Sequence, residues 1–126
     1  MSAKRILIVD DEPDIREVAQ MSLETVSGWQ VLTAESGEEG ITKAKQEKPD
    51  AILLDAMMPS MDGPATFQKL QADPSTKQIP VIMFTAKVQA ADRKRFADLG
   101  VKDVIAKPFD PMTLGSQIAA ILGWSQ

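Results

Sequence analysis

The stretch RILIVDD, residues 5–11, joins a short apolar run rich in β-branched residues to two consecutive aspartates. Runs of the same kind recur along the chain at Trp29–Thr33, Ala51–Leu54, Val81–Phe84 and Val101–Ala106. Together with Arg5–Val9 they predict five strands.

The segments between these runs have helical spacing, and they predict five helices. The positions expected on the buried side of the first helix are Ile15, Val18, Ala19, Leu23 and Val26, with Gly28 after its end. Later helices are indicated by a capping box of Ser36 with Glu39 ahead of Ile41 and Ala44, by Phe67 and Leu70 ahead of Asp73-Pro74, by Ala91, Phe96 and Leu99 ahead of Gly100, and by an Asp110-Pro111 cap ahead of Leu114, Ile118 and Ile121.

Strands that alternate with helices predict one α/β domain over residues 1–126, a doubly wound, five-stranded parallel sheet with helices on both faces. Right-handed crossovers leave few topologies, and the flavodoxin-like strand order 2-1-3-4-5 is favoured at this length. The working site of such a sheet lies outside the carboxyl ends of its strands, where strands 1 and 3 diverge.

Composition excludes several kinds of site. The chain has no cysteine and no histidine, so disulfides, thiolate metal sites and imidazole chemistry are impossible. A net charge of −4 and the lack of a basic stripe argue against direct binding to nucleic acid. No apolar run is long enough to span a bilayer, and the N-terminus lacks a signal-peptide core, so we expect a cytoplasmic protein that contacts no membrane.

Polar residues follow four of the expected strands. Asp10 and Asp11 follow the first, Asp55 the third, Thr85-Ala86 the fourth and Lys107-Pro108 the fifth. All of these ends lie at one edge of a parallel sheet, so three carboxylates, a hydroxyl and an ammonium should converge there. Lys107 offsets about one charge, and the remaining oxygen ligands suit Mg²⁺ better than Ca²⁺ or Zn²⁺.

Such a site can accept a phosphoryl group. The Asp55 carboxylate would act as the nucleophile and form an acyl phosphate. Mg²⁺ and Lys107 would neutralise charge on the phosphoryl oxygens, and the Thr85 hydroxyl could donate a hydrogen bond to one of them.

These residues resemble the receiver domains of two-component response regulators over essentially the whole chain. The resemblance is carried by IVDDEP (8–13), LD (54–55) with MPSMDG (58–63), FTA (84–86) and KPF (107–109). Each fragment is weak alone, but four fragments in this order at the strand ends are specific.

The resemblance implies a role for each site residue. Asp55 would be the phosphoacceptor. Asp11, Asp55 and the backbone carbonyl of Met57 would bind Mg²⁺ directly, and Asp10 would bind it directly or through water. Thr85 and the Ala86 amide would hold the phosphoryl group, Lys107 would pair with it, and the Lys107–Pro108 bond would be cis.

The resemblance also implies partners. A sensor histidine kinase or a phosphotransfer protein would supply the phosphoryl group, and a downstream protein would read the changed conformation. The chain would catalyse only its own phosphorylation and dephosphorylation, so it is not expected to be an enzyme in the usual sense. We expect a stand-alone regulator acting through protein contacts; the alternative is a fragment of a longer regulator.

Two positions depart from the family pattern. Val104 stands where many relatives have an aromatic ring that rotates on activation, so switching should depend on Thr85 and the segment after it. Met57 stands where many have a polar residue. With Lys87, Met57 should flank the path of the attacking water, and an apolar side chain there predicts slow loss of the phosphoryl group.

Other interpretations remain. The same fold could serve as a binding module that needs no phosphorylation, although such a module would not need this full set of polar residues. A metal-dependent phosphatase is disfavoured because Met57 replaces a second acidic residue. Asp11 could simply cap the first helix, and Glu12 is expected at a solvated helix start. Gly63 is expected to adopt a positive φ. The basic residues Arg93, Lys94 and Arg95 are expected on a solvated face.

Overall fold

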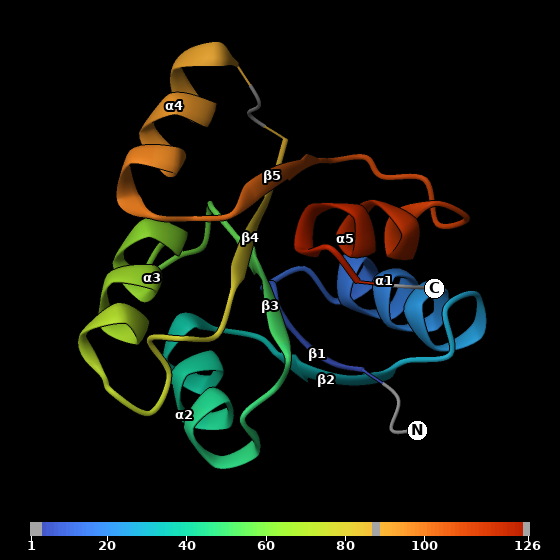
Figure 1. Cartoon of the computed structure of the whole chain (residues 1–126), viewed down its shortest axis with the longest axis horizontal. Coiled ribbons are helices and arrows are strands. Elements are labelled where there is room, and N and C mark those ends of the chain that lie inside the picture. The colour runs from blue at the N-terminus through green and yellow to red at the C-terminus, as the bar shows by residue number, and fades with distance from the viewer. Residues whose placement is uncertain (1–3, 87–88, 125–126) are drawn as a thin grey trace.

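A computed structural model describes residues 4–86 and 89–124 and has five strands alternating with five helices (Figure 1). The strands are β1 (Arg5–Val9), β2 (Gln30–Ala34), β3 (Ala51–Asp55), β4 (Val81–Thr85) and β5 (Asp103–Ala106). The helices are α1 (Pro13–Thr25), α2 (Gly37–Glu47), α3 (Gly63–Ala72), α4 (Ala90–Leu99) and α5 (Leu114–Leu122). All strand pairs are parallel and the order is β2-β1-β3-β4-β5, so the predicted flavodoxin-like topology is confirmed.

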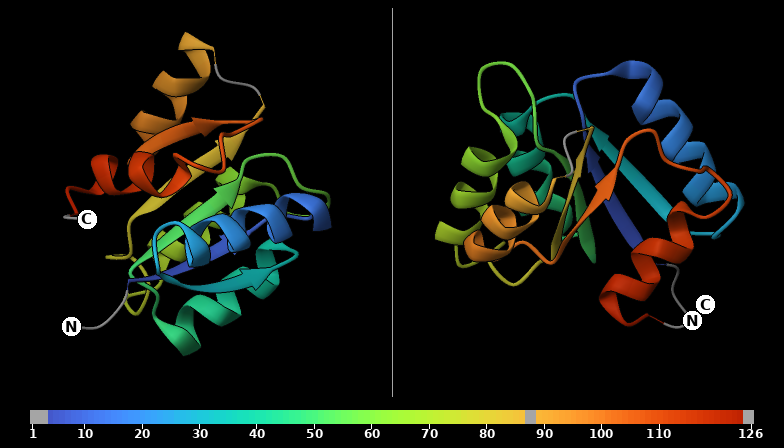
Figure 2. Two further views of the ribbon diagram at one scale, coloured as in Figure 1. Left: turned by 90° about the vertical axis from the view of Figure 1, so that its right-hand side faces the viewer. Right: turned by 90° about the horizontal axis from the view of Figure 1, so that it is seen from above.

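The helices cover both faces of the sheet. Helices α1 and α5 lie on one face, and α2, α3 and α4 lie on the other (Figures 1 and 2). Successive residues of β1 point to opposite sides: Ile6 and Ile8 pack with α1 and α5, whereas Leu7 and Val9 pack with the other three helices. The central strands are therefore buried on both faces, as their continuous apolar sequence requires.

The apolar face of α1 differs from its prediction. Ala19 and Leu23 are buried, but Val18 and Val26 are 44% and 47% exposed. Ser22 is buried instead, because α1 packs beside α5 and the Ser22 hydroxyl donates a hydrogen bond to the Pro111 carbonyl. Helical spacing alone did not reveal a buried polar position of this kind.

The helix caps were predicted in part. The Ser36 hydroxyl accepts the Glu39 amide at 3.1 Å as expected, but the Glu39 carboxylate accepts the amide of Glu35 at 2.7 Å rather than that of Ser36. The Asp110 cap was placed too early, since α5 begins at Leu114.

Asp110 instead stabilises the turn before α5, where its side chain accepts the Met112 amide at 2.9 Å. Three further predictions were inexact: β2 lies one residue later than expected, β5 begins at Asp103 rather than Val101, and Ala91 of α4 is exposed.

Gly63 does not have the positive φ expected of it; in that loop the residue with positive φ is Ser60, at 69°. The need for glycine at position 63 is steric. A Cβ there would lie 2.6 Å from Ala56 Cα and 2.7 Å from the Asp55 carbonyl oxygen. The start of α3 is thereby held tightly against the end of β3.

Within residues 4–86 and 89–124, no helix has the length and apolar character needed to cross a bilayer.

Candidate functional site

The carboxyl ends of four strands bring the predicted polar residues together. Asp10 directly follows β1, Asp55 ends β3, Thr85 ends β4 and Lys107 directly follows β5. Asp10, Asp55 and Thr85 are all buried, at 0%, 2% and 1% exposure. Burial of polar side chains at one sheet edge costs free energy, and sites of this kind are commonly functional.

Lys107 is the centre of the cluster. Its Nζ lies 2.7 Å from Asp10 Oδ2 and 3.5 Å from Asp55 Oδ1. It also lies 3.3 Å from Glu12 Oε1 and 5.0 Å from the centre of the Phe84 ring. Glu12 was expected only at a solvated helix start. Its carboxylate contacts Lys107, so Glu12 is a site residue that the sequence did not reveal.

The surroundings of Asp55 oppose its ionisation. Burial is the largest cause, and it raises the pKa of Asp55 from 3.8 to about 7 against the lowering effect of a hydrogen bond from the Met57 amide. The Asp10 charge and the Asp11 carboxyl raise this pKa further, while Lys107 lowers it. For Lys107, burial alone would lower the pKa, but the carboxylates of Asp10, Asp55 and Glu12 outweigh it and raise the pKa.

Two buried oxygens indicate room for a further positive charge. Asp55 Oδ2 accepts no hydrogen bond from the described residues, and Asp10 Oδ2 has only its ion-pair contact with Lys107. Carboxylate oxygens of Asp10, Asp11, Glu12 and Asp55 lie within 4.8 Å of one another. A donor set made only of oxygen, with more negative than positive charge, fits a small hard cation such as Mg²⁺.

Asp11 and Met57 take less constrained positions. Asp11 is half-buried and does not cap α1: Glu12 is at the N-cap position without a side-chain cap, and its amide donates to Asp10 Oδ1 at 2.9 Å. The Met57 amide donates to Asp55 Oδ1 at 3.1 Å, and the Met57 side chain is 55% exposed.

The remaining predicted positions are as follows. Ala86 is exposed beside Thr85, and Lys87 lies outside the described residues. The Lys107–Pro108 bond is cis, as the resemblance implied. Val104 is buried in the core on the side of α2, α3 and α4.

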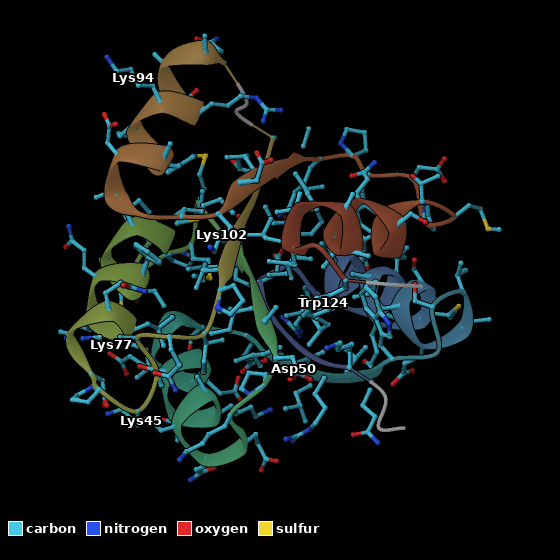
Figure 3. All side chains as sticks on the ribbon, in the orientation of Figure 1. Lys45, Asp50, Lys77, Lys94, Lys102 and Trp124 are labelled. Carbon is cyan, nitrogen blue, oxygen red and sulfur yellow. The ribbon has the colours of Figure 1, made fainter. Side chains whose placement is uncertain are left out.

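The basic residues of α4 do not form one surface. Arg93 Nη1 lies 3.3 Å from Asp103 Oδ1 on β5. Lys94, in the middle of α4, points away from the domain (Figure 3). The Arg95 guanidinium lies 5.1 Å from the centre of the Phe96 ring.

Comparisons with known proteins agree with this geometry. A model of the response regulator receiver domain matches residues 6–119. The alkaline phosphatase synthesis transcriptional regulatory protein PhoP of Bacillus subtilis is 41% identical over 123 residues, which are 98% of this chain and 50% of that protein. The chain spans about half the length of the curated relatives that it matches.

Solved structures match over nearly their full length. The chemotaxis protein CheY4 of Vibrio cholerae is 28% identical, with a TM-score of 0.89, and the match covers 95% of this chain and 99% of that one. A receiver domain from a sensor histidine kinase of Pseudomonas aeruginosa PAO1 is also 28% identical, with a TM-score of 0.84 and coverage of 97% and 99%. That structure has a magnesium ion coordinated in its active site cleft.

Proposed function

The chain belongs to the response regulator receiver domain family, and we propose that it accepts a phosphoryl group on Asp55 from a phosphohistidine of a sensor histidine kinase or a phosphotransfer protein. The proposal rests on the contacts of the two Asp55 carboxylate oxygens. Its Oδ1 lies 3.5 Å from Lys107 Nζ, and its Oδ2 is buried without a hydrogen-bond partner among the described residues.

The transfer exchanges one bond for another. Asp55 Oδ2 attacks phosphorus, the bond between phosphorus and the donor's imidazole nitrogen breaks, and the imidazole keeps the electron pair. Asp55 must be ionised to attack, and its burial opposes this by raising its pKa. Added positive charge near Asp10 and Asp55 would lower that pKa and favour the nucleophilic form.

Mg²⁺ fits this requirement. Asp11, Asp55 and the backbone carbonyl of Met57 would hold it, with Asp10 contributing directly or through water. When bound, the ion supplies positive charge to the phosphoryl oxygens and to the crowded carboxylates.

Three groups of the chain would hold the phosphoryl oxygens. Lys107 already lies between Asp10 and Asp55 and would pair with one oxygen. The Thr85 hydroxyl and the Ala86 amide would donate hydrogen bonds from the end of β4. This makes the chain an acceptor that processes only its own phosphoryl group.

Signalling would start at Thr85. Movement of its hydroxyl toward the phosphoryl group would shift the segment that leads to α4, and a downstream protein would bind the altered face. Val104 has no ring to rotate, so beryllofluoride should change amide exchange at Thr85, Ala86 and residues 89–92. Changes confined to β5 would contradict this route.

The proposed setting is the cytoplasm, with protein partners and no direct contact of this domain with nucleic acid or membrane. Some relatives are named as transcriptional regulators, among them the DNA-binding regulator RpaA of Synechocystis. Because the match covers only 48% of that protein, its name sets no role for this domain.

Incubation with acetyl phosphate tests the proposal. Intact-mass measurement should find one phosphoryl group per chain with Mg²⁺, and none with chelator or in Asp55→Asn. Asp73→Asn is the matched control, since Asp73 lies in the α3–β4 connection, and it should label like wild type.

The two alternative functions give different results. A binding module that needs no phosphorylation would stay unlabelled although folded. A phosphatase would release phosphate over many turnovers from added phosphomonoesters. Equal labelling of Asp55→Asn and wild type would refute the acceptor assignment.

A further inference from the structure

A groove of about 830 Å³ lies beside the phosphorylation site, between the β3–α3 loop, α3 and α4. It shares Ala56, Met57 and Thr85 with the surroundings of Asp55. Its volume is within the range of sites that bind small organic molecules. None of the proposed steps of phosphoryl transfer uses it.

Helix α4, which forms one side of the groove, contributes little to the core. Phe96 is the one buried side chain of this helix, and Leu99 is partly buried. The rest of α4 is largely polar and charged, and the N-terminal end of the helix projects outward from the sheet in Figure 1. Four residues of α4 line the groove: Asp92, Arg95, Phe96 and Leu99.

The lining of the groove is mixed, and six of its eleven residues are apolar. Met57 and Met58 come from the β3–α3 loop, Pro64 from α3, and Phe96 and Leu99 from α4. Methionine side chains are flexible and adapt to differently shaped ligands. This part of the groove suits the hydrocarbon or aromatic body of a ligand.

The two carboxylates of the groove accept backbone hydrogen bonds at helix starts, whereas its arginine has no ion-pair partner among the described residues. Asp62 Oδ1 accepts the Ala65 amide at 2.9 Å at the start of α3, and Asp92 Oδ2 accepts the Gln89 amide at 3.3 Å at the start of α4. The helix N-terminus compensates each carboxylate. Arg95 has no carboxylate within ion-pair distance among residues 4–86 and 89–124 and contacts only the Phe96 ring.

From these contacts we infer that the groove binds an amphipathic organic anion, with its apolar body against Met58, Phe96 and Leu99 and its anionic group on Arg95. A bound molecule would lie against Met57 and Thr85, which flank Asp55. The inference goes beyond phosphoryl transfer and is tested on the unphosphorylated chain.

Two dyes that differ in one charged group provide the test. Anilinonaphthalene sulfonate carries an aromatic body and a sulfonate, and N-phenylnaphthylamine has a closely similar body without the charge. Arg95→Gln should weaken binding of the sulfonate dye about fivefold, as expected for a partly exposed ion pair, and leave binding of the neutral dye unchanged. Lys94→Gln makes the same charge change one residue away, on a side chain that points outward (Figure 3), and should alter neither dye.

Methionine methyl resonances locate the dye independently of any variant. The sulfonate dye should shift the methyl signals of Met57 and Met58. The signals of Met21 and Met112 should stay unchanged, although these side chains are 58% and 68% exposed. Equal weakening by Arg95→Gln and Lys94→Gln, or shifts at Met21 and Met112 instead, would overturn the inference.

Discussion

Asp55 and Asp73 belong to the same small domain, yet their surroundings shift their pKa values in opposite directions. At the carboxyl edge of the sheet, burial raises the pKa of Asp55 to about 7. In the α3–β4 connection, which lies at the opposite edge, hydrogen bonds from the hydroxyl and amide of Ser75, together with Lys45, lower the pKa of Asp73 to about 2.

The contacts explain the difference. Asp73 Oδ1 accepts the Ser75 amide at 2.8 Å and the Ser75 hydroxyl at 2.7 Å, and its Oδ2 lies 3.1 Å from Lys45 Nζ. The protein itself satisfies this carboxylate. Asp55 shares one lysine with Asp10 and Glu12 and keeps a buried oxygen without a hydrogen bond among the described residues. Incomplete satisfaction at Asp55 costs stability and leaves capacity for a cation and a phosphoryl group.

The largest expected effect is the pH dependence of stability without metal. The folded pKa of Asp55 is about 7 against 3.8 for the ordinary group, so the folded state binds this proton more tightly than the unfolded state. The stabilisation that comes from protonated Asp55 is complete below the ordinary pKa of 3.8. It is lost as the pH rises to the folded pKa of about 7. At about 1.4 kcal/mol per pKa unit, the loss amounts to a few kcal/mol.

Asp55→Asn should remove this dependence and be more stable than wild type at mildly alkaline pH. Urea unfolding in chelator over this pH range measures both proteins. If the stability of both proteins changed with pH in the same way, Asp55 would not be the source of the pH dependence.

The next effect in size is the response to Mg²⁺. An ion that binds only the folded chain adds about 2.7 kcal/mol at a hundredfold excess over its Kd. Asp11→Ala should lose most of this gain. In chelator its free energy of unfolding should exceed that of wild type by around 1 kcal/mol, because carboxylate repulsion is relieved, and its melting temperature should be higher. Asp14→Ala, at an exposed position in the first turn of α1, is the control and should keep the full response.

Thermal melting with chelator and with Mg²⁺ decides between the possibilities. A full Mg²⁺ response in Asp11→Ala would mean that the metal lies elsewhere. Destabilisation of this variant in chelator would assign Asp11 a structural role.

A smaller effect of opposite sign is expected at Asp73. The pKa of Asp73 in the folded protein is about 2, below the ordinary value of 3.8. The ionised carboxylate therefore stabilises the fold above pH 3.8, and this stabilisation is lost as the pH falls through about 2. Asp73→Asn should therefore lower the melting temperature at neutral pH, and the difference from wild type should shrink on acidification.

Ser75→Ala should cause a similar loss at neutral pH, and the double variant should lose less than the sum of the two. Additive losses would show that the Ser75 hydroxyl is not what stabilises the Asp73 charge.

The smallest expected effect concerns the lifetime of the phosphoryl group. The Met57 side chain is 55% exposed beside Asp55 and cannot orient an attacking water. Wild type should lose the phosphoryl group several-fold more slowly than Met57→Asn, as followed by the decay of the labelled mass. Equal or faster decay in wild type would remove Met57 from this role.

The strand ends could be predicted well because two simple signals coincide there. Short apolar runs marked the strands, and parallel topology required Asp10, Asp55, Thr85 and Lys107 to meet at one edge. The convergence of these residues did not depend on side-chain detail. Their chemical roles still depend on the experiments above.

Features that arise from packing between distant segments were not predictable in this way. Ser22 is buried because Pro111, far along the chain, offers a carbonyl, and Gly63 is required by the approach of Ala56. The contact of Glu12 with Lys107 is made by the end of a long side chain that is 59% exposed. Helical periodicity and turn propensity contain no information on such contacts.

Reductive trapping tests the central claim most directly, because borohydride converts an aspartyl phosphate to homoserine and so marks the acceptor residue itself. Wild type is incubated with acetyl phosphate and Mg²⁺, reduced, digested and sequenced by mass spectrometry. Homoserine should appear at Asp55 alone, and it should be absent when chelator replaces Mg²⁺. Homoserine at Asp10 or Asp11, or an equal yield at Asp55 without Mg²⁺, would contradict the account.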